Sequence, residues 1–179
     1  MKSKHKLVML FLLSLLTFLS LMPLRAIASD ASSLENNPTG LGVIFGEPTG
    51  FTAKFWMPEH QAIDAGLAFS LSSYVLIYSD YLFHFPGVFG NSTEFTRAMS
   101  PYVGVGAEII ISENSVRTNN HYFDTPGSST GLGIRIPLGI EWALKTMPIG
   151  IFAELVPGMG ITPGTYGFFQ GGVGARWYF

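Results

Sequence analysis

Apolar and polar side chains alternate with a period of two along most of the chain after residue 40. This alternation is typical of β-strands, in which successive side chains point to opposite faces. Eight segments show it, separated by stretches rich in Gly, Pro and polar residues that predict turns and loops. The predicted strands are Gly40–Gly46, Gly50–Met57, Gln61–Leu71, Ser73–Phe85, Pro101–Ser112, Gly131–Leu144, Ile149–Ile161 and Tyr166–Phe179.

Each predicted strand has one apolar face and one face of small or polar residues. In the sixth strand Ile134 and Ile136 share the apolar face, while Arg135 lies on the other. The last strand likewise sets Trp177 against Arg176. An apolar face toward lipid and a polar face toward a lumen are typical of membrane barrels. The pattern predicts an all-β fold, an eight-stranded antiparallel up-and-down transmembrane β-barrel over residues 40–179.

A soluble sandwich or a lipocalin-like barrel would show the same alternation with the apolar face turned inward. Two observations favour the membrane form. The charged residues share the glycine-rich face, as a narrow lumen requires. Aromatic residues also recur near the C-terminal ends of the even-numbered strands, which share one rim and would form a girdle at one membrane interface. The predicted girdle consists of Phe55, Phe83, Phe85, Trp142, Trp177 and Phe179.

Residues 1–28 have the features of a signal peptide. A basic region with Lys2, Lys4 and Lys6 precedes an apolar run, and Ala26-Ile27-Ala28 has the small-x-small form of a cleavage site. The apolar run approaches the length of a spanning helix, so an uncleaved anchor is the alternative. Cleavage after Ala28 would leave residues 29–39 as a flexible periplasmic N-terminus. The exported barrel is expected in the cell outer membrane.

Removal of residues 1–28 takes away four of the ten basic residues and no acidic one, which leaves 6 basic against 12 acidic residues. The resulting net charge of −6 argues against nucleic acid as a partner. The mature chain contains no run of the ~20 apolar residues that a membrane helix needs. Because backbone polar groups must be satisfied inside a bilayer, a closed barrel is the alternative that remains.

The inward register gathers charged residues in the lumen, where isolated charges would be costly and must pair. The interior of an eight-stranded barrel is just wide enough to be filled by side chains, so we interpret these residues as a structural polar plug. The predicted plug consists of Lys54, Asp64, Asp80, His84, Glu108, Arg135, Glu141, Glu154 and Arg176. Carboxylates beside a histidine leave catalysis as the alternative.

The sequence motifs give little support to an enzymatic or metal-binding function. A lipid-modifying barrel enzyme would place His and Ser two residues apart on a lipid-facing strand, but His84 is followed by Phe85 and Pro86. The histidines also lack the spacing of a metal site. The sequence therefore predicts a protein that is not an enzyme and has no cofactor or metal.

Several motifs resemble those of known outer-membrane barrels. They are Gly42-Val43-Ile44-Phe45-Gly46-Glu47-Pro48-Thr49-Gly50 with Lys54, Asp80-Tyr81 with His84, Gly133-Ile134-Arg135-Ile136-Pro137-Leu138-Gly139, Glu154-Leu155-Val156-Pro157, and Gly171 through Phe179. The pattern resembles the small barrels of the OmpA-transmembrane-domain and OmpX type, and more closely a domain-of-unknown-function family of such barrels. This resemblance implies the fold and the compartment.

The last strand also resembles the signal read by the barrel-assembly machinery, with Val173, Ala175, Trp177 and Phe179 at alternate positions.

The expected function is a non-enzymatic structural or surface-interaction role in the envelope, in contact with outer-membrane lipid and lipopolysaccharide. The polar loop Glu113–Thr130 would present itself to an extracellular partner. A narrow small-solute channel and a lipid-modifying enzyme are the alternatives. The connection Gly87–Ser100 is unusually long for a periplasmic turn.

Overall fold

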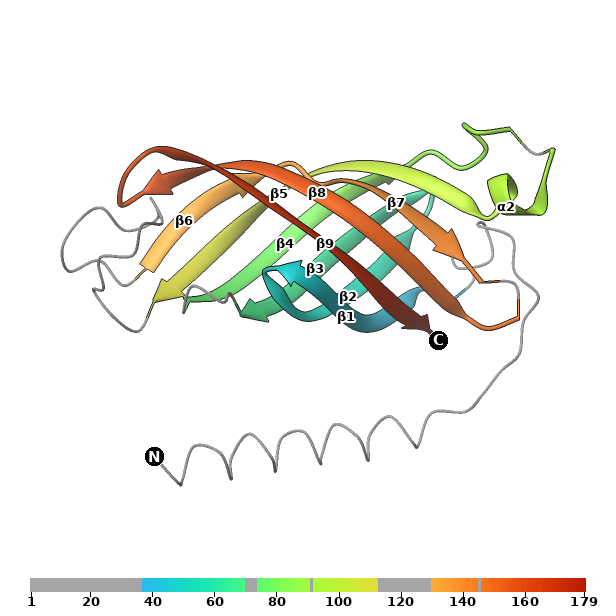
Figure 1. Cartoon of the computed structure of the whole chain (residues 1–179), viewed down its shortest axis with the longest axis horizontal. Helices are drawn as coiled ribbons and strands as arrows, with labels where there is room; N and C mark the ends of the chain where they lie inside the picture. The colour runs from blue at the N-terminus through green and yellow to red at the C-terminus, as the bar shows by residue number, and fades with distance from the viewer. Residues whose placement is uncertain (1–36, 70–73, 91, 113–129, 145) are drawn as a thin grey trace, which may run out of the picture.

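The computed structural model describes residues 37–69, 74–90, 92–112, 130–144 and 146–179. In this part of the chain, antiparallel strands wrap into a closed barrel whose strands are inclined to its long axis (Figure 1). Strands that follow one another in sequence pair, except that β6 and β7 each pair with β5 and β8, and β1 pairs with β9 to close the ring. The strands are β1 (Thr39–Glu47), β2 (Thr49–Met57), β3 (Gln61–Phe69), β4 (Tyr74–His84), β5 (Met99–Ser112), β6 (Thr130–Arg135), β7 (Leu138–Ala143), β8 (Ile149–Thr162) and β9 (Tyr166–Tyr178).

β6 and β7 occupy one position in the ring. The prediction of one unbroken strand over Gly131–Leu144 is wrong at Pro137, which has no N–H to donate to a ladder. Both pieces keep one register against β5, since Gly106 pairs with Arg135 and Val103 with Leu138. The nine strands of the sheet therefore fill eight positions, and the predicted eight-stranded antiparallel barrel is confirmed.

Some predicted boundaries differ from the structure. β1 begins at Thr39, inside the predicted flexible N-terminus, and β5 begins at Met99 rather than at Pro101. The predicted signal peptide, residues 29–36 of the predicted N-terminus, and residues 113–129 of the predicted extracellular loop lie outside the described residues.

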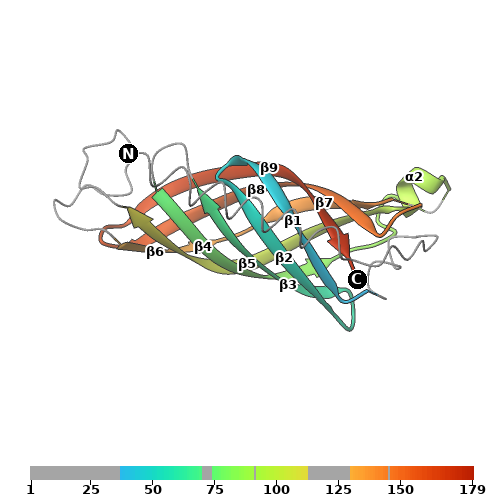
Figure 2. The same ribbon diagram turned by 90° about the horizontal axis from the view of Figure 1, so that it is seen from below.

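Large inward side chains lie over glycines of neighbouring strands. A Cβ atom at Gly139 would overlap the Tyr102 ring, and one at Gly40 would overlap the ring of Tyr178. Glycine is required at such positions because a ring can then lie directly on the backbone of the next strand. The glycine-rich face is therefore the face that allows the narrow interior to hold large side chains. Figure 2 shows the inclined strands β1, β2 and β9 from below.

A short helix, α2 (Glu94–Arg97), lies in the connection between β4 and β5. Its N-cap is Thr93, whose hydroxyl accepts a hydrogen bond from the Thr96 N–H and so satisfies one of the free amides of the first turn. The helix lies at the same end of the barrel as the C-terminus (Figure 1). We call this the α2 end. The opposite end, where Pro48 joins β1 to β2, is the Pro48 end.

Candidate functional site

The barrel interior contains all nine charged or histidine side chains that the sequence predicted for the lumen. None is more than 6% exposed, because each lies at an inward position of its strand. They extend from strands on all sides of the ring and meet in three connected groups around Lys54, Arg176 and Arg135. The buried residues are Lys54, Asp64, Asp80, His84, Glu108, Arg135, Glu141, Glu154 and Arg176.

The first group surrounds Lys54 toward the α2 end. The Lys54 ammonium forms an ion pair with Glu141 on β7 and lies 2.8 Å from Nε2 of His84. The other carboxylate oxygen of Glu141 accepts a hydrogen bond of 2.5 Å from the Tyr178 hydroxyl. The ammonium also lies 4.3 Å from the centre of the Trp56 ring, a cation–π distance. Lys54 is therefore compensated by an acid, an imidazole and an aromatic face.

The second group joins β9 to β2 and β3. Nη2 of Arg176 donates to Asp64 at 2.5 Å and to the Thr52 hydroxyl at 3.0 Å. The Thr52 hydroxyl in turn donates to the second carboxylate oxygen of Asp64 at 2.7 Å. The Arg176 guanidinium lies 3.7 Å from the centre of the Phe152 ring. These contacts connect strands that are distant in sequence.

The third group is looser and is centred on Arg135. Its Nε lies 3.1 Å from Asp80, whereas Nη1 and Nη2 lie 3.8 and 3.7 Å from Glu108 and Glu154. The guanidinium carbon lies 4.0 Å from the centre of the Tyr78 ring. One cation thus faces three carboxylates here, whereas Lys54 and Arg176 together face the other two, Glu141 and Asp64. The excess acidic charge of the interior is concentrated around Arg135.

Some polar atoms of the Arg135 group have no hydrogen-bond partner among the described residues. They include Oε1 of Glu108, Oε1 of Gln170 and the Tyr78 hydroxyl. A cavity of about 10 Å³ is lined by Tyr78, Arg135, Glu154 and Gln170. That volume is at the lower limit for one water molecule, which could supply part of the missing hydrogen bonding.

Apolar layers lie on both sides of the charged groups. One cluster lies toward the α2 end and contains Trp56, Ala62, Leu82, Tyr102, Ala143 and Tyr178. The other lies toward the Pro48 end and contains Ala68, Tyr74, Leu76, Tyr78 and Ile110. Buried apolar side chains therefore accompany the charged groups toward each end of the barrel.

His84 also lies near a serine, as a nucleophilic enzyme would require. The Ser100 hydroxyl is 3.4 Å from Nδ1 of His84. A lysine ammonium can only donate, so Nε2 of His84 accepts from Lys54 and Nδ1 carries the imidazole proton. A histidine in this form donates to Ser100 and does not withdraw its proton. The geometry therefore favours a structural role for this trio.

Metal chemistry also lacks a suitable site in the described residues, where no group of three or more His, Asp or Glu side chains is arranged to hold a metal ion. No helix in the same residues is both long and apolar enough to cross a membrane.

Thr52, Gln170 and Tyr178 lie at inward positions of the alternating pattern, but the predicted plug omitted them. The structure makes Thr52 a bridge between Arg176 and Asp64. Gln170 donates to Glu108 at 3.0 Å, and Tyr102 donates to Glu154 at the same distance. The inward position of each residue in its strand was the signal in the sequence that could have indicated membership of the network. Their partners lie on other strands, so the pattern within one strand does not reveal them.

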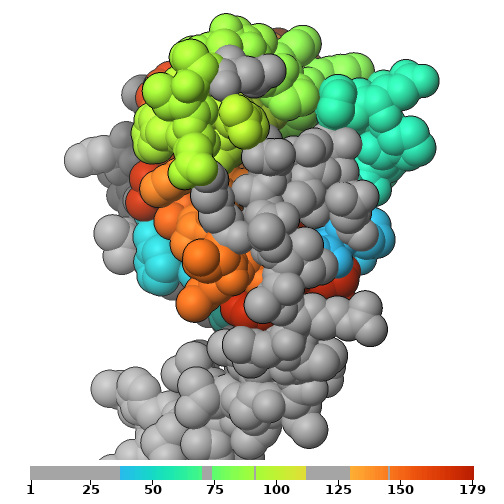
Figure 3. Space-filling view, turned by 90° about the vertical axis from the view of Figure 1, so that its right-hand side faces the viewer, coloured from blue at the N-terminus to red at the C-terminus, as the bar shows by residue number. Residues whose placement is uncertain are grey.

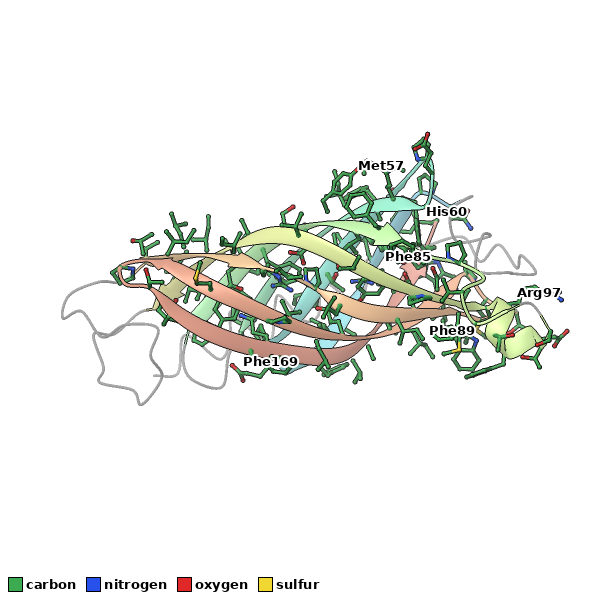
Figure 4. All side chains as sticks on the ribbon, turned by 90° about the horizontal axis from the view of Figure 1, so that it is seen from above. Met57, His60, Phe85, Phe89, Arg97 and Phe169 are labelled. Carbon is green, nitrogen blue, oxygen red and sulfur yellow. The ribbon has the colours of Figure 1, made fainter. Side chains whose placement is uncertain are left out.

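The six predicted girdle aromatics lie on the outer surface near the α2 end. Trp177 is half-buried and the other five are exposed: Phe55, Phe83, Phe85, Trp142 and Phe179. A second set of exposed aromatics, Phe45, Phe69 and Phe169, lies nearer the Pro48 end, and Figure 4 shows Phe169 projecting from the barrel wall. The predicted single girdle therefore omitted the aromatics near the other end.

The described residues thus define a closed antiparallel β-barrel with charged side chains inside and apolar side chains outside. The chain belongs to the family described as "Protein of unknown function (DUF3996)", whose model matches residues 32–179. Among solved structures, the crystal structure of Neisserial surface protein A is similar to this chain, with 13% identity and a TM-score of 0.48. The match covers 79% of this chain and 93% of that chain. No curated protein matches.

Proposed function

We propose that this protein spans the bacterial outer membrane as a β-barrel whose lumen is closed by its own side chains, and that its role in the envelope is non-enzymatic. The observation that carries this proposal is the inverted polarity of the barrel. Arg135, Arg176 and Lys54 are buried inside, while large aliphatic and aromatic side chains cover the outside. A soluble barrel would require the opposite arrangement.

The outer surface supports contact with lipid. Val105 and Leu155 are each 54% exposed, and Val173 is 58% exposed, although all three lie within strands. Burying one such side chain fully is worth ~1.5–3 kcal/mol, and the exposed apolar positions recur around the ring. A continuous apolar wall of this kind matches the hydrocarbon region of a membrane. The predicted signal peptide is consistent with export to that membrane.

The interior supports a plug and not an open pore. The ion pairs Lys54–Glu141 and Arg176–Asp64 each link strands that are not neighbours in the sheet, and buried apolar clusters accompany them toward both ends. Removing one partner from such a pair lowers the stability of the fold, so the network stabilises the barrel wall as well as filling the lumen. We further propose that Glu113–Thr130 is the extracellular surface available to a partner.

Reconstitution of the purified protein into lipid vesicles tests the proposal. We expect protection from protease, heat-modifiable migration on denaturing gels, and a β-type circular dichroism spectrum that requires detergent or lipid. The same preparation, fused into planar bilayers, should show no steady ion conductance. A protein that stays folded and monodisperse without detergent would overturn the membrane assignment. Reproducible single-channel steps would instead overturn the plug and favour the narrow channel.

A further inference from the structure

The β4–β5 connection, residues 85–98, exposes apolar side chains beyond the barrel wall at the α2 end. Val88 is 65% exposed, Phe89 is 50% exposed and Phe95 is 55% exposed. Figure 4 shows Phe85 and Phe89 on this side of the molecule, with Arg97 farther along the connection. A connection that only joined two strands in water would have no need for these side chains.

Backbone geometry puts two of the apolar residues at the tip of a turn. The Gly90 N–H donates to the Gly87 carbonyl at 2.9 Å, so Val88 and Phe89 are the two central residues of the turn. Gly87 and Gly90 have φ values of 80° and 78°, which glycine adopts at little cost. Central turn positions usually carry Gly, Pro, Asn, Asp or Ser. Two bulky apolar side chains at such a tip indicate an apolar surrounding.

The third apolar residue is fixed against the outside of the barrel. The centre of the Phe95 ring lies 5.3 Å from the centre of the outward-facing Trp142 ring, and the angle between the two ring planes is 60°. The chain is then attached at Ala98, which is buried and whose carbonyl accepts the Ala143 N–H at 3.0 Å. Figure 3 looks at this end and shows yellow-green atoms of this region gathered beside orange atoms of the β7–β8 region. The connection is thus continuous with the aromatic girdle.

We propose that the β4–β5 connection is an interfacial membrane anchor, which places Val88, Phe89 and Phe95 in the lipid leaflet at the α2 end of the barrel. This inference rests on the proposed membrane-spanning function. The occupant of the apolar surface is the headgroup boundary of the leaflet that Phe85 and Trp142 already meet. Aromatic rings favour that depth, and the polar Glu94 and Arg97 can remain in water beside it.

The absence of cysteine from the sequence allows a direct test. The full chain carrying Val88→Cys is labelled with an environment-sensitive fluorophore and reconstituted into phosphatidylcholine–phosphatidylglycerol vesicles with or without nitroxide lipids. Ser92→Cys is the matched control, because Ser92 is an exposed polar residue of the same connection. Ile109→Cys, on the outer face of β5, is the control for the barrel wall.

We expect the label at residue 88 to emit at shorter wavelength than the label at residue 92, and to be quenched by shallow nitroxide lipids at least about twofold more strongly. Equal, water-like behaviour at residues 88 and 92, with strong quenching at residue 109, would overturn the anchor while leaving the membrane barrel intact. Loss of quenching at residue 109 as well would show that the proposed membrane function itself has failed, and the anchor with it.

Discussion

Lys54 has two acidic residues within reach, and only one of them forms its ion pair. Asp64 lies directly opposite Lys54 in the β2–β3 register, so neighbouring strands could have paired these two charges. Instead, Lys54 contacts Glu141 across the lumen, and Asp64 binds Arg176. Both pairs therefore join strands that are not neighbours in the sheet. Because burial makes an unpaired charge expensive, the network should tolerate the loss of one partner poorly.

We therefore predict that Lys54→Met destabilises the barrel by about 3 kcal/mol, since it leaves Glu141 without its ammonium partner. The double variant Lys54→Met/Glu141→Gln should recover part of this loss, because a glutamine oxygen can still accept the Tyr178 hydroxyl. Urea unfolding in lipid vesicles, followed by tryptophan fluorescence, measures both changes. Arg97→Met, at an exposed basic residue, should stay within about 0.5 kcal/mol. A double variant less stable than the single one would contradict this account.

At the scale of the element, Pro137 interrupts a strand without changing its path. The Gly104 N–H donates to the Pro137 carbonyl at 2.8 Å, and the Ile136 N–H donates to the Pro157 carbonyl at 2.9 Å. The wall therefore stays hydrogen-bonded on both sides of the break. What is missing is the N–H of residue 137 itself, which proline cannot supply.

Pro137→Ala should restore that donor toward Gly104 and make residues 130–143 one continuous strand. We expect the new amide of residue 137 to exchange slowly with solvent deuterium, like the amide of Ile136. Stability should change by less than about 1 kcal/mol, because the gained hydrogen bond is offset by lost ring packing and a freer unfolded chain. Amide exchange followed by NMR in detergent micelles measures this. Fast exchange at residue 137 would show that the strand break has another cause.

At the scale of the whole molecule, the last strand closes the ring against the first. Gly40 through Glu47 pair with Tyr178 through Gly171, so the barrel cannot close until β9 is in place. The backbone N–H of Phe179 donates to the Thr39 carbonyl at 2.9 Å, while its side chain is exposed on the outer surface. The ring of Phe179 therefore lies on the outer surface and takes no part in the packing of the lumen.

If the terminal aromatic is an assembly signal, Phe179→Ala should lower the folded amount of the protein in outer membranes severalfold and leave refolding of purified protein in detergent unchanged. Heat-modifiable bands on denaturing gels quantify both. Phe169→Ala removes an exposed aromatic from β9, the strand that Phe179 directly follows, and should assemble normally. Equal losses for the two variants, or failure of purified Phe179→Ala to refold, would point to a stability effect and not to recognition.

The inner and outer faces of the barrel were readable from the sequence, because the alternation of side chains in a strand is a local property with period two. It placed Lys54, Arg135 and Arg176 inside, and the structure buries all three. The partners of these charges were not readable. Whether Lys54 meets Asp64 or Glu141 depends on how eight positions close into a ring and how far its strands are staggered. The ring contact of Phe95 with Trp142 likewise arises only when the β4–β5 connection folds back on the barrel wall. Local pattern therefore determined the face of each side chain, and closure of the ring decided its partners.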